Sequence, residues 1–397
     1  MSSEQDEDIE QKLVETVRNV RLTLDRIDED AASDPAEIKK FIEDETNHVA
    51  IRREVDLDET KIEEALKALE SQDLPPFEPP EGTYPLELML SGSPISILED
   101  YHRYQPVGIH HAQGGVGSKG SYIIACKLDS EPSLPSLMVL KEATPNAPLE
   151  VFASKVMRAM GLVSPRFKVL SPDEFRDLAK RLRGAQVTVA GSCAAIHEPS
   201  ASEMGGLIME YLSGKTISDL DDGSVFDHEE VLRNIGRCMA VDMALNCLDR
   251  IPLIWSNDGN PTNLLIATDT HEVHVIDSAY NRILNEDSSK ERLDRIREAV
   301  QEARSERIGE YGERVRRFFA KATQGKVQLS DIQVVKLFHA MREGCEELLA
   351  LQKQVFERAA RETRAEFERI GLGAKFNLDS CLDLDFCTNA VQAMTGR

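Results

Sequence analysis

The chain has 397 residues, of which 41% are hydrophobic, and a formal net charge of −23 at neutral pH. The length and the hydrophobic content are sufficient for two lobes with a real core and an accessory segment. The large negative charge argues against general binding to nucleic acid or to an acidic membrane, because such binding needs lysines and arginines that face phosphates.

Targeting and redox signals indicate an intracellular protein. No apolar run approaches the roughly 18 residues of a membrane span, and residues 1–10 show no signal-peptide pattern. The seven cysteines are odd in number and scattered, and no two of them form a CxxC pair. Such a distribution is typical of a reduced protein. We therefore expect a cytoplasmic protein with no membrane span and no nucleic-acid partner.

Residues 1–80 form an acidic segment with helical patterns. They hold 24 acidic and 10 basic residues, so this part alone carries a net charge of −14. Apolar residues from Leu13 to Ile27 recur at spacings of 4 and 3, which predicts one seam of a helix. Thr60 and Glu63 match a capping box that begins a second helix, and a stiff proline-rich linker follows. We expect a helical extension that is either a solvated appendage or a dimerisation or regulatory arm.

A glycine-rich stretch lies between two strand-like runs. Gly115, Gly117 and Gly120 fit GxGxxG, but the sequence after them is β-branched rather than helical. A dinucleotide-binding loop should open into a helix, and a Walker A loop should carry its lysine after the last glycine, whereas Lys119 precedes Gly120. A hairpin whose backbone N–H groups approach phosphates accounts for the pattern better. A glycine-rich surface turn without a ligand is the alternative.

Lys141 closes an apolar strand that begins at Leu137. A lysine in this position must find an anion or reach the surface. The predicted helix that begins near Pro148 supplies an anion in its first turn, Glu150. We expect Lys141 and Glu150 to pair, which would hold the ammonium group over nucleotide phosphates.

Residues 206–214, GLIMEYLSG, form an apolar strand that ends in polar residues. In a two-lobed nucleotide enzyme, backbone groups at such an exit hydrogen-bond the edge of an adenine. Glu210 and Leu212 are then the candidates for nucleotide binding. The alternative is an ordinary core strand.

Three polar residues suited to phosphoryl transfer follow a predicted buried helix over residues 228–245. Asp249 comes shortly after the helix, and Asn263 and Asp277 flank two short strands with a turn between them. A hairpin of this kind brings Asn263 and Asp277 to one end. An amide oxygen and a carboxylate placed together there could hold Mg²⁺ against a nucleotide, and Asp249 would receive a hydroxyl proton.

Six short blocks stand in order along residues 90–285. They are GGVGSKGSY (114–122), VLKEAT (139–144), LEVFASKVMRAMGL (149–162), LIMEYLSG (207–214), NCLDRIP with GNPTNLLI (246–266) and HVIDSA (274–279). In this order the blocks resemble the catalytic domain of the actin-fragmin kinase family, an atypical branch of the protein-kinase-like superfamily. Six ordered blocks are far more specific than any one of them.

The resemblance implies a two-lobed, protein-kinase-like α+β fold over residues 84–370. A β-rich N-lobe would cover residues 84–214 and a helical C-lobe residues 215–370. The acidic helical extension of residues 1–80 would precede this domain, and a C-terminal tail, residues 371–397, would follow it.

The resemblance also implies an ATP- and Mg²⁺-dependent protein serine/threonine kinase, with actin or an actin complex as the suggested substrate. Asp249 would be the catalytic base, supported by Lys141 and Glu150. The nucleotide would lie against Gly115, Gly117, Lys119, Gly120, Lys141, Glu210 and Leu212, and the metal against Asn263 and Asp277. A pseudokinase scaffold and a lipid or small-molecule kinase of the same fold are the alternatives.

The catalytic segment departs from that of ordinary protein kinases in spacing and in its neighbouring residues. Asp249 and Asn263 are 14 positions apart, whereas ordinary kinases place only four residues between these two roles. Arg250 follows the aspartate instead of preceding it, and Ser278 and Ala279 replace the usual Phe and Gly after Asp277. We expect an activation segment too short for switching by phosphorylation.

Overall fold

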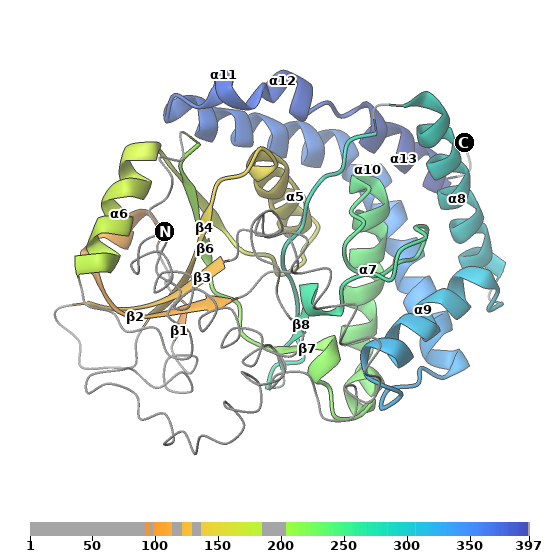
Figure 1. Cartoon of the computed structure of the whole chain (residues 1–397). Helices are drawn as coiled ribbons and strands as arrows, with labels where there is room; N and C mark the ends of the chain where they lie inside the picture. Colours follow the sequence, from red (N-terminus) through yellow and green to blue (C-terminus); the bar gives the residue numbers. More distant parts are fainter. Residues whose placement is uncertain are drawn as a thin grey trace, which may run out of the picture. The chain divides into compact units, whose positions relative to one another are not determined.

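The computed structural model describes residues 93–94, 98–112, 121–128, 136–184, 204–267, 269–283, 285–305 and 307–395. From Pro79 onward the chain forms one compact unit of mixed α/β architecture, in which an antiparallel sheet is followed by helices (Figure 1). This order is compatible with a two-lobed kinase-like domain. The predicted helices of residues 1–80 lie outside the described residues, so that extension and the domain boundaries stay predictions.

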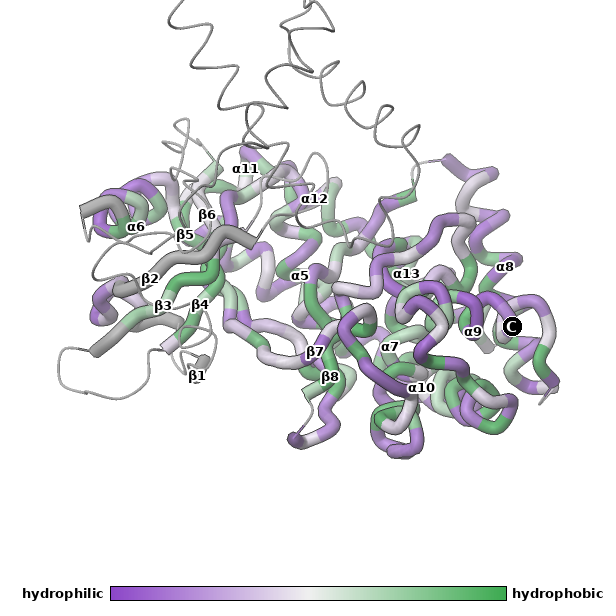
Figure 2. The backbone as a smooth tube through the Cα atoms, turned by 60° about the horizontal axis from the view of Figure 1, so that its bottom comes forward, coloured by the Kyte–Doolittle hydropathy of each residue, from purple (hydrophilic) through white to green (hydrophobic). Residues whose placement is uncertain are grey.

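A six-stranded sheet dominates the first part of this unit. Its strand order is β2, β3, β4, β6 and β5, all antiparallel neighbours, and the short β1 runs parallel to β4. Hydrophobic residues line β3 and β4, as Figure 2 shows. The bounds are Ser93–Pro94 for β1, Tyr104–Ala112 for β2, Ser121–Leu128 for β3, Ser136–Glu142 for β4, Phe167–Leu170 for β5 and Gly206–Glu210 for β6. A 3-10 helix, η1 (Leu98–Arg103), precedes β2.

The side-chain alternation of β4 decides which helix faces which residue. Met138 and Leu140 pack with α6 (Pro172–Gly184) in one hydrophobic cluster. Ala143 belongs to a second cluster, together with residues of α5 (Ala147–Ala159). Because neighbouring strand residues point to opposite faces, Lys141 lies on the α5 side. The predicted helix that contains Pro148 is therefore confirmed, and it faces the lysine.

The second part of the unit is helical around a small sheet. The sheet contains β7 (Lys215–Thr216), β8 (Leu264–Ile266) and β9 (Val273–Val275). The helices are α7 (Glu229–Leu245), α8 (Glu286–Ser305), α9 (Glu310–Ala322), α10 (Asp331–Arg369), α11 (Gly373–Phe376), α12 (Leu378–Cys381) and α13 (Asp385–Thr395). Three short 3-10 helices lie in the connections around this sheet. They are η2 (Ile217–Asp219) and η3 (Ser224–Asp227), between β7 and α7, and η4 (Pro261–Asn263), directly before β8. None of the helices in the described ranges is long and apolar enough to cross a membrane.

The 39-residue helix α10 connects the two parts (Figure 1). It begins with a capping box between Ser330 and Gln333 and extends for about 58 Å. Its first half packs on α7, and near its end Phe367 joins the cluster that covers the sheet beside α5. Lys155 of α5 also forms an ion pair with Glu366 at 2.8 Å. The end of α10 thereby holds α5, the helix that faces Lys141, in position.

The C-terminal residues pack into two of the hydrophobic clusters. Phe376 and Leu378 join the cluster beside α5. Phe386 and Val391 of α13 are buried in the large helical core. Residues 371–395 of the predicted C-terminal tail therefore contain three helices whose apolar side chains pack against the rest of the unit.

Gly236 of α7 offers a test of the contact between α7 and α10. A Cβ atom there would lie 2.5 Å from the carbonyl oxygen of Leu337 and 2.6 Å from Cβ of Ala340. We expect Gly236→Ala to lower the free energy of unfolding by about 1–3 kcal/mol, because overpacking outweighs the gain in helix propensity. Denaturant unfolding measures this. The control is Gly223→Ala, whose Cβ meets only Val327 at 3.9 Å; equal stability of the two variants would contradict the close contact.

Candidate functional site

Lys141 lies where β4, α5 and the segment after β9 meet. Its Nζ donates one hydrogen bond to Glu150 and one to Asp277, each at 2.9 Å. Burial disfavours the ammonium group, but the two carboxylates outweigh this effect and hold the pKa of Lys141 above its ordinary value. In the register of the sheet Lys141 stands opposite Ser121, the residue directly after the glycine-rich stretch. The predicted pairing of Lys141 with Glu150 is present in the structure.

Glu150 reaches the lysine because the N-terminus of α5 is positioned by local hydrogen bonds. A turn precedes the helix, and the backbone N–H of Glu150 donates to the carbonyl oxygen of Asn146 at 3.0 Å. Burial raises the pKa of Glu150 and the charge of Asp277 adds to this rise, while Lys141 opposes it. Since only 11% of its side chain is exposed, Glu150 depends on Lys141 as its counter-charge.

Asp249 lies in the loop after α7. The helix ends at Leu245, and Asn246 follows with a left-handed backbone (φ 46°), which ends the helix and changes the direction of the chain. The side-chain amide of Asn246 donates to the carbonyl oxygen of Asn281, and that of Asn281 donates to the carbonyl oxygen of Asn246. This reciprocal pair joins the loop that carries Asp249 to the segment that follows Asp277.

Asn263 and Asp277 lie at the same end of the β8–β9 hairpin, as predicted. The register pairs Leu264 with Val275, and the N–H of Ile276 donates to the carbonyl oxygen of Asn263 at 3.1 Å. The side-chain Nδ2 of Asn263 donates to the backbone oxygen of Asp249 at 2.8 Å and to its carboxylate at 3.0 Å. Asp249, Asn263 and Asp277 therefore lie close together, although 14 positions of the sequence separate Asp249 from Asn263 and another 14 separate Asn263 from Asp277.

The negative charges of Asp249 and Asp277 repel each other in this cluster. Burial raises the pKa of Asp249 and the charge of Asp277 raises it further, whereas the hydrogen bond from Asn263 lowers it. Lys141 is bonded to Asp277 rather than to Asp249. A cation beside both carboxylates would relieve their repulsion. Within the described ranges, no three His, Cys, Asp or Glu side chains are grouped to hold a metal ion.

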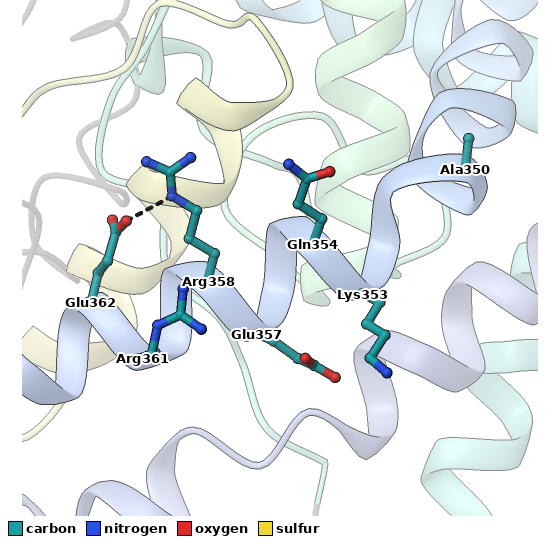
Figure 3. Close-up of a pocket in the computed structure, with 7 residues that line it drawn as sticks. All are labelled: Ala350, Lys353, Gln354, Glu357, Arg358, Arg361 and Glu362. Atoms are coloured by element: carbon teal, nitrogen blue, oxygen red, sulfur yellow. Dashed lines mark hydrogen bonds and ion pairs between the residues drawn. The ribbon is translucent and has the colours of Figure 1, made fainter.

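A cavity of about 290 Å³ opens at this cluster. Side chains from β4, α5 and the loops after α7 and β9 line it: Lys141, Asn146, Glu150, Cys247, Leu248, Asp249, Asp277, Ala279 and Asn281. A larger cavity of about 720 Å³ lies along one face of α10, between Ala350 and Glu362 (Figure 3). Its charged side chains come from one helix, and Arg358 and Glu362 pair with each other. Convergence of groups from separate elements favours the smaller cavity as the site.

The structure does not place every predicted residue in this cavity. Glu210 forms an ion pair with Arg166 at 2.6 Å, which lowers the pKa of Glu210 against the effect of burial. Glu210 and Leu212 do not line the cavity, and Asn263, which is buried, lies behind Asp249 and is not among the lining residues either. The predicted phosphate-binding residues Gly115, Gly117, Lys119 and Gly120 lie outside the described residues.

Sequence reasoning missed two kinds of residue at the site. Asn146 and Asn281 line the cavity, and their only signal was proximity to Glu150 and Asp277. Arg250 was noted for its unusual order but not for its surroundings; it is fully buried beside Asp242. The signal that could have found it is an acidic residue inside the apolar run of a predicted helix.

The chain is similar to proteins of a known kinase family. The family model described as actin-fragmin kinase, catalytic, matches residues 109–339, more than half of the chain. A Dictyostelium discoideum protein that provisionally bears the name actin-fragmin kinase is 29% identical over 148 residues. The match covers 36% of this chain and 35% of that protein, so the chain spans about a third of the length of its curated relative.

The Lys141–Glu150 pair can be tested by a double-mutant cycle. Lys141→Met should lower the free energy of unfolding by about 2–4 kcal/mol, because it leaves a buried carboxylate without its counter-charge. Adding Glu150→Gln should recover part of that loss. Without Lys141 the already raised pKa of Glu150 rises further, so the deficit should grow as the pH increases above the ordinary glutamate value of about 4.3.

Denaturant unfolding at several pH values measures this cycle. The control is Lys215→Met, which removes a lysine from an exposed pair with Asp221 and should leave the unfolding midpoint essentially unchanged. Strict additivity of Lys141→Met and Glu150→Gln would show that the two side chains are not coupled.

Proposed function

The chain belongs to the actin-fragmin kinase catalytic family, and we propose that it transfers the γ-phosphate of ATP to a serine or threonine hydroxyl of a protein. The observation that carries the proposal is the position of Lys141 between Glu150 and Asp277. A lysine held by a helix glutamate, next to a metal-binding aspartate, is the arrangement that protein kinases require around the phosphates. The opposing register position, Ser121, follows the glycine-rich stretch, which accords with a phosphate-covering role for that stretch.

Asp249 is the proposed catalytic base. Its carboxylate is at the surface of the cavity, where an incoming hydroxyl can reach it. The side-chain Nδ2 of Asn263 orients Asp249 through one hydrogen bond to the carboxylate and one to the backbone oxygen. Burial and the charge of Asp277 raise the pKa of Asp249, which moves it toward the range of an effective general base at neutral pH.

Asn263 and Asp277 fit a magnesium site. Carboxylate and amide oxygens are the hard ligands that Mg²⁺ prefers, and Asn263 uses its nitrogen, not its oxygen, toward Asp249. Burial is the main cause of the raised pKa of Asp249, and the charge of Asp277 adds to it; a divalent cation would relieve this second contribution. When bound, Mg²⁺ would neutralise charge on the β- and γ-phosphate oxygens. Asp277 would then bind that ion, while the hydrogen bond from Lys141 fixes the position of its carboxylate.

Actin or an actin complex is the substrate that the family and the name of the relative suggest. We propose that the reaction takes place in the cytoplasm, because the odd number and the scatter of the cysteines along the sequence are typical of a reduced protein. A lipid or small-molecule kinase would share the same catalytic residues and differ in its acceptor. Incubation of the protein with Mg·ATP and either actin or a panel of lipids discriminates between the two.

Hydrogen bonds to the C-terminal part of the chain hold the segment after Asp277 in place without any phosphate group. The hydroxyl of Tyr280 donates to the carbonyl oxygen of Asp383 at 2.8 Å. Arg282 donates to the carbonyl oxygen and to the hydroxyl of Ser380, both at 2.6 Å. These bonds hold the segment against α12 and the start of α13. We propose that phosphorylation of this segment is not needed for activity.

Asp249→Asn tests the proposed base. We expect phosphoryl transfer to fall by about 10²–10⁴-fold, since an amide cannot accept the hydroxyl proton. In the unmodified protein the acidic limb of kcat/KM should lie above the ordinary aspartate pKa of about 3.9, because Asp249 must lose its proton and its pKa is raised. The control is Asp258→Asn, an exposed carboxylate of the same loop that pairs with Lys321. Unchanged transfer by Asp249→Asn would refute the assigned base.

Independence from phosphorylation is tested at Ser288, an exposed hydroxyl in the first turn of α8. Ser288→Ala, and phosphatase treatment of the unmodified protein, should each leave kcat within about twofold, because the preceding segment is already anchored. Phosphoryl transfer to actin or to the identified acceptor measures this. Loss of activity in either experiment, with the folded fraction unchanged, would show that a phosphate is required.

A further inference from the structure

Arg250 is fully buried, and each N–H of its guanidinium group has an acceptor. Nε donates to one carboxylate oxygen of Asp242 at 3.0 Å, and Nη2 donates to the other oxygen and to Sγ of Cys247. Nη1 donates to the carbonyl oxygen of Ile276 at 2.9 Å and to the hydroxyl of Ser278 at 3.0 Å. A guanidinium group has five N–H donors, so its capacity is filled.

Two of these acceptors belong to residues next to the candidate site. Ile276 and Ser278 are the two chain neighbours of Asp277, and Arg250 itself follows Asp249. One side chain therefore joins the backbone segments that carry the two carboxylates. Asp277 has a left-handed backbone (φ 48°), a conformation that a residue with a side chain adopts only when its surroundings hold it. Nη1 of Arg250 holds that turn from both sides.

Asp242 supplies the charge that makes this arrangement possible. It lies in the interior of α7 and is 1% exposed. A carboxylate in the apolar face of a helix is unfavourable unless it is paired, and here its two oxygens accept from the fork of Arg250. A lysine has its donors on a single nitrogen, so it could not reach Asp242, Ile276 and Ser278 together.

We propose that Arg250, oriented by Asp242, is the positioning residue that sets Asp249 and Asp277 at the spacing needed for phosphoryl transfer. This inference rests on the proposed kinase function. Where phosphorylation switches a kinase, new arginine–phosphate pairs order the activation loop. Here the carboxylate of Asp242 is a permanent partner, and Arg250 has no N–H left for a phosphate.

The test compares the affinity of the protein for metal and nucleotide in variants of this pair. Mn²⁺ binding is measured by electron paramagnetic resonance in the presence of a non-hydrolysable ATP analogue, so the readout does not require turnover. Arg250→Lys keeps the positive charge but loses the planar guanidinium group that donates to Asp242, Ile276 and Ser278 at the same time. Asp242→Asn combined with Arg250→Gln removes both buried charges at once. We expect each to bind the Mn²⁺–nucleotide pair at least tenfold more weakly, because Asp277 is no longer held.

Ser278→Ala provides a milder variant that keeps the ion pair intact. It removes one acceptor of Nη1, and we expect about threefold weaker Mn²⁺–nucleotide binding. If the charge variants fail to fold, this variant decides the question. The control is Thr323→Val, which removes a buried hydroxyl that donates to Phe319 and accepts from Val327 at the end of α9. It should lower thermal stability and leave the affinity unchanged.

The outcomes separate the positioning role from the proposed function. Weaker binding by the folded Arg250, Asp242 and Ser278 variants, with normal binding by Thr323→Val, supports the positioning role. Affinities within twofold of the unmodified protein in all folded variants would overturn it and leave the kinase proposal intact. Failure of the unmodified protein to bind Mn²⁺ with the nucleotide would overturn the proposed function itself.

Discussion

An ammonium group that is largely withdrawn from water has to be neutralised where it lies, and Lys141 imposes that condition on three separate elements. The strand β4 delivers the lysine to the face covered by α5, where Glu150 is nearly buried. The second partner of the lysine, Asp277, comes from the end of a distant hairpin. Because the charges satisfy one another, sheet, helix and hairpin keep one relative position, which is the frame of the candidate site.

A second buried cation organises the other side of that site. Arg250 joins the interior of α7 to the turn that contains Asp277, and Asn263 joins that hairpin to Asp249. The two carboxylates are thus supported by rigid elements and not by loops alone. The long insertion between Asp249 and Asn263 can exist without loosening the site, because the bonds that define the geometry bypass it.

Local signals in the sequence were sufficient for part of this arrangement. The pairing of Lys141 with Glu150 and the hairpin that unites Asn263 with Asp277 follow from alternation, helix starts and turns, which act over a few residues. The bond between Asp242 and Arg250 could not be predicted in this way, because it depends on the left-handed turn at Asn246 that reverses the chain between them. The packing of the C-terminal helices beside α5 was also beyond reach, since short apolar runs do not reveal which distant surface they cover.

The attachment of α5 to the end of α10 has a consequence for inhibition. Lys155 pairs with Glu366, and Phe367 packs in the cluster behind α5. Moving α5, and Glu150 with it, away from Lys141 would therefore break an ion pair and open a hydrophobic cluster to which residues 367–378 contribute. With the proposed function, a small molecule that traps a displaced α5 would have to supply that energy, whereas a compound that competes with the proposed nucleotide would not.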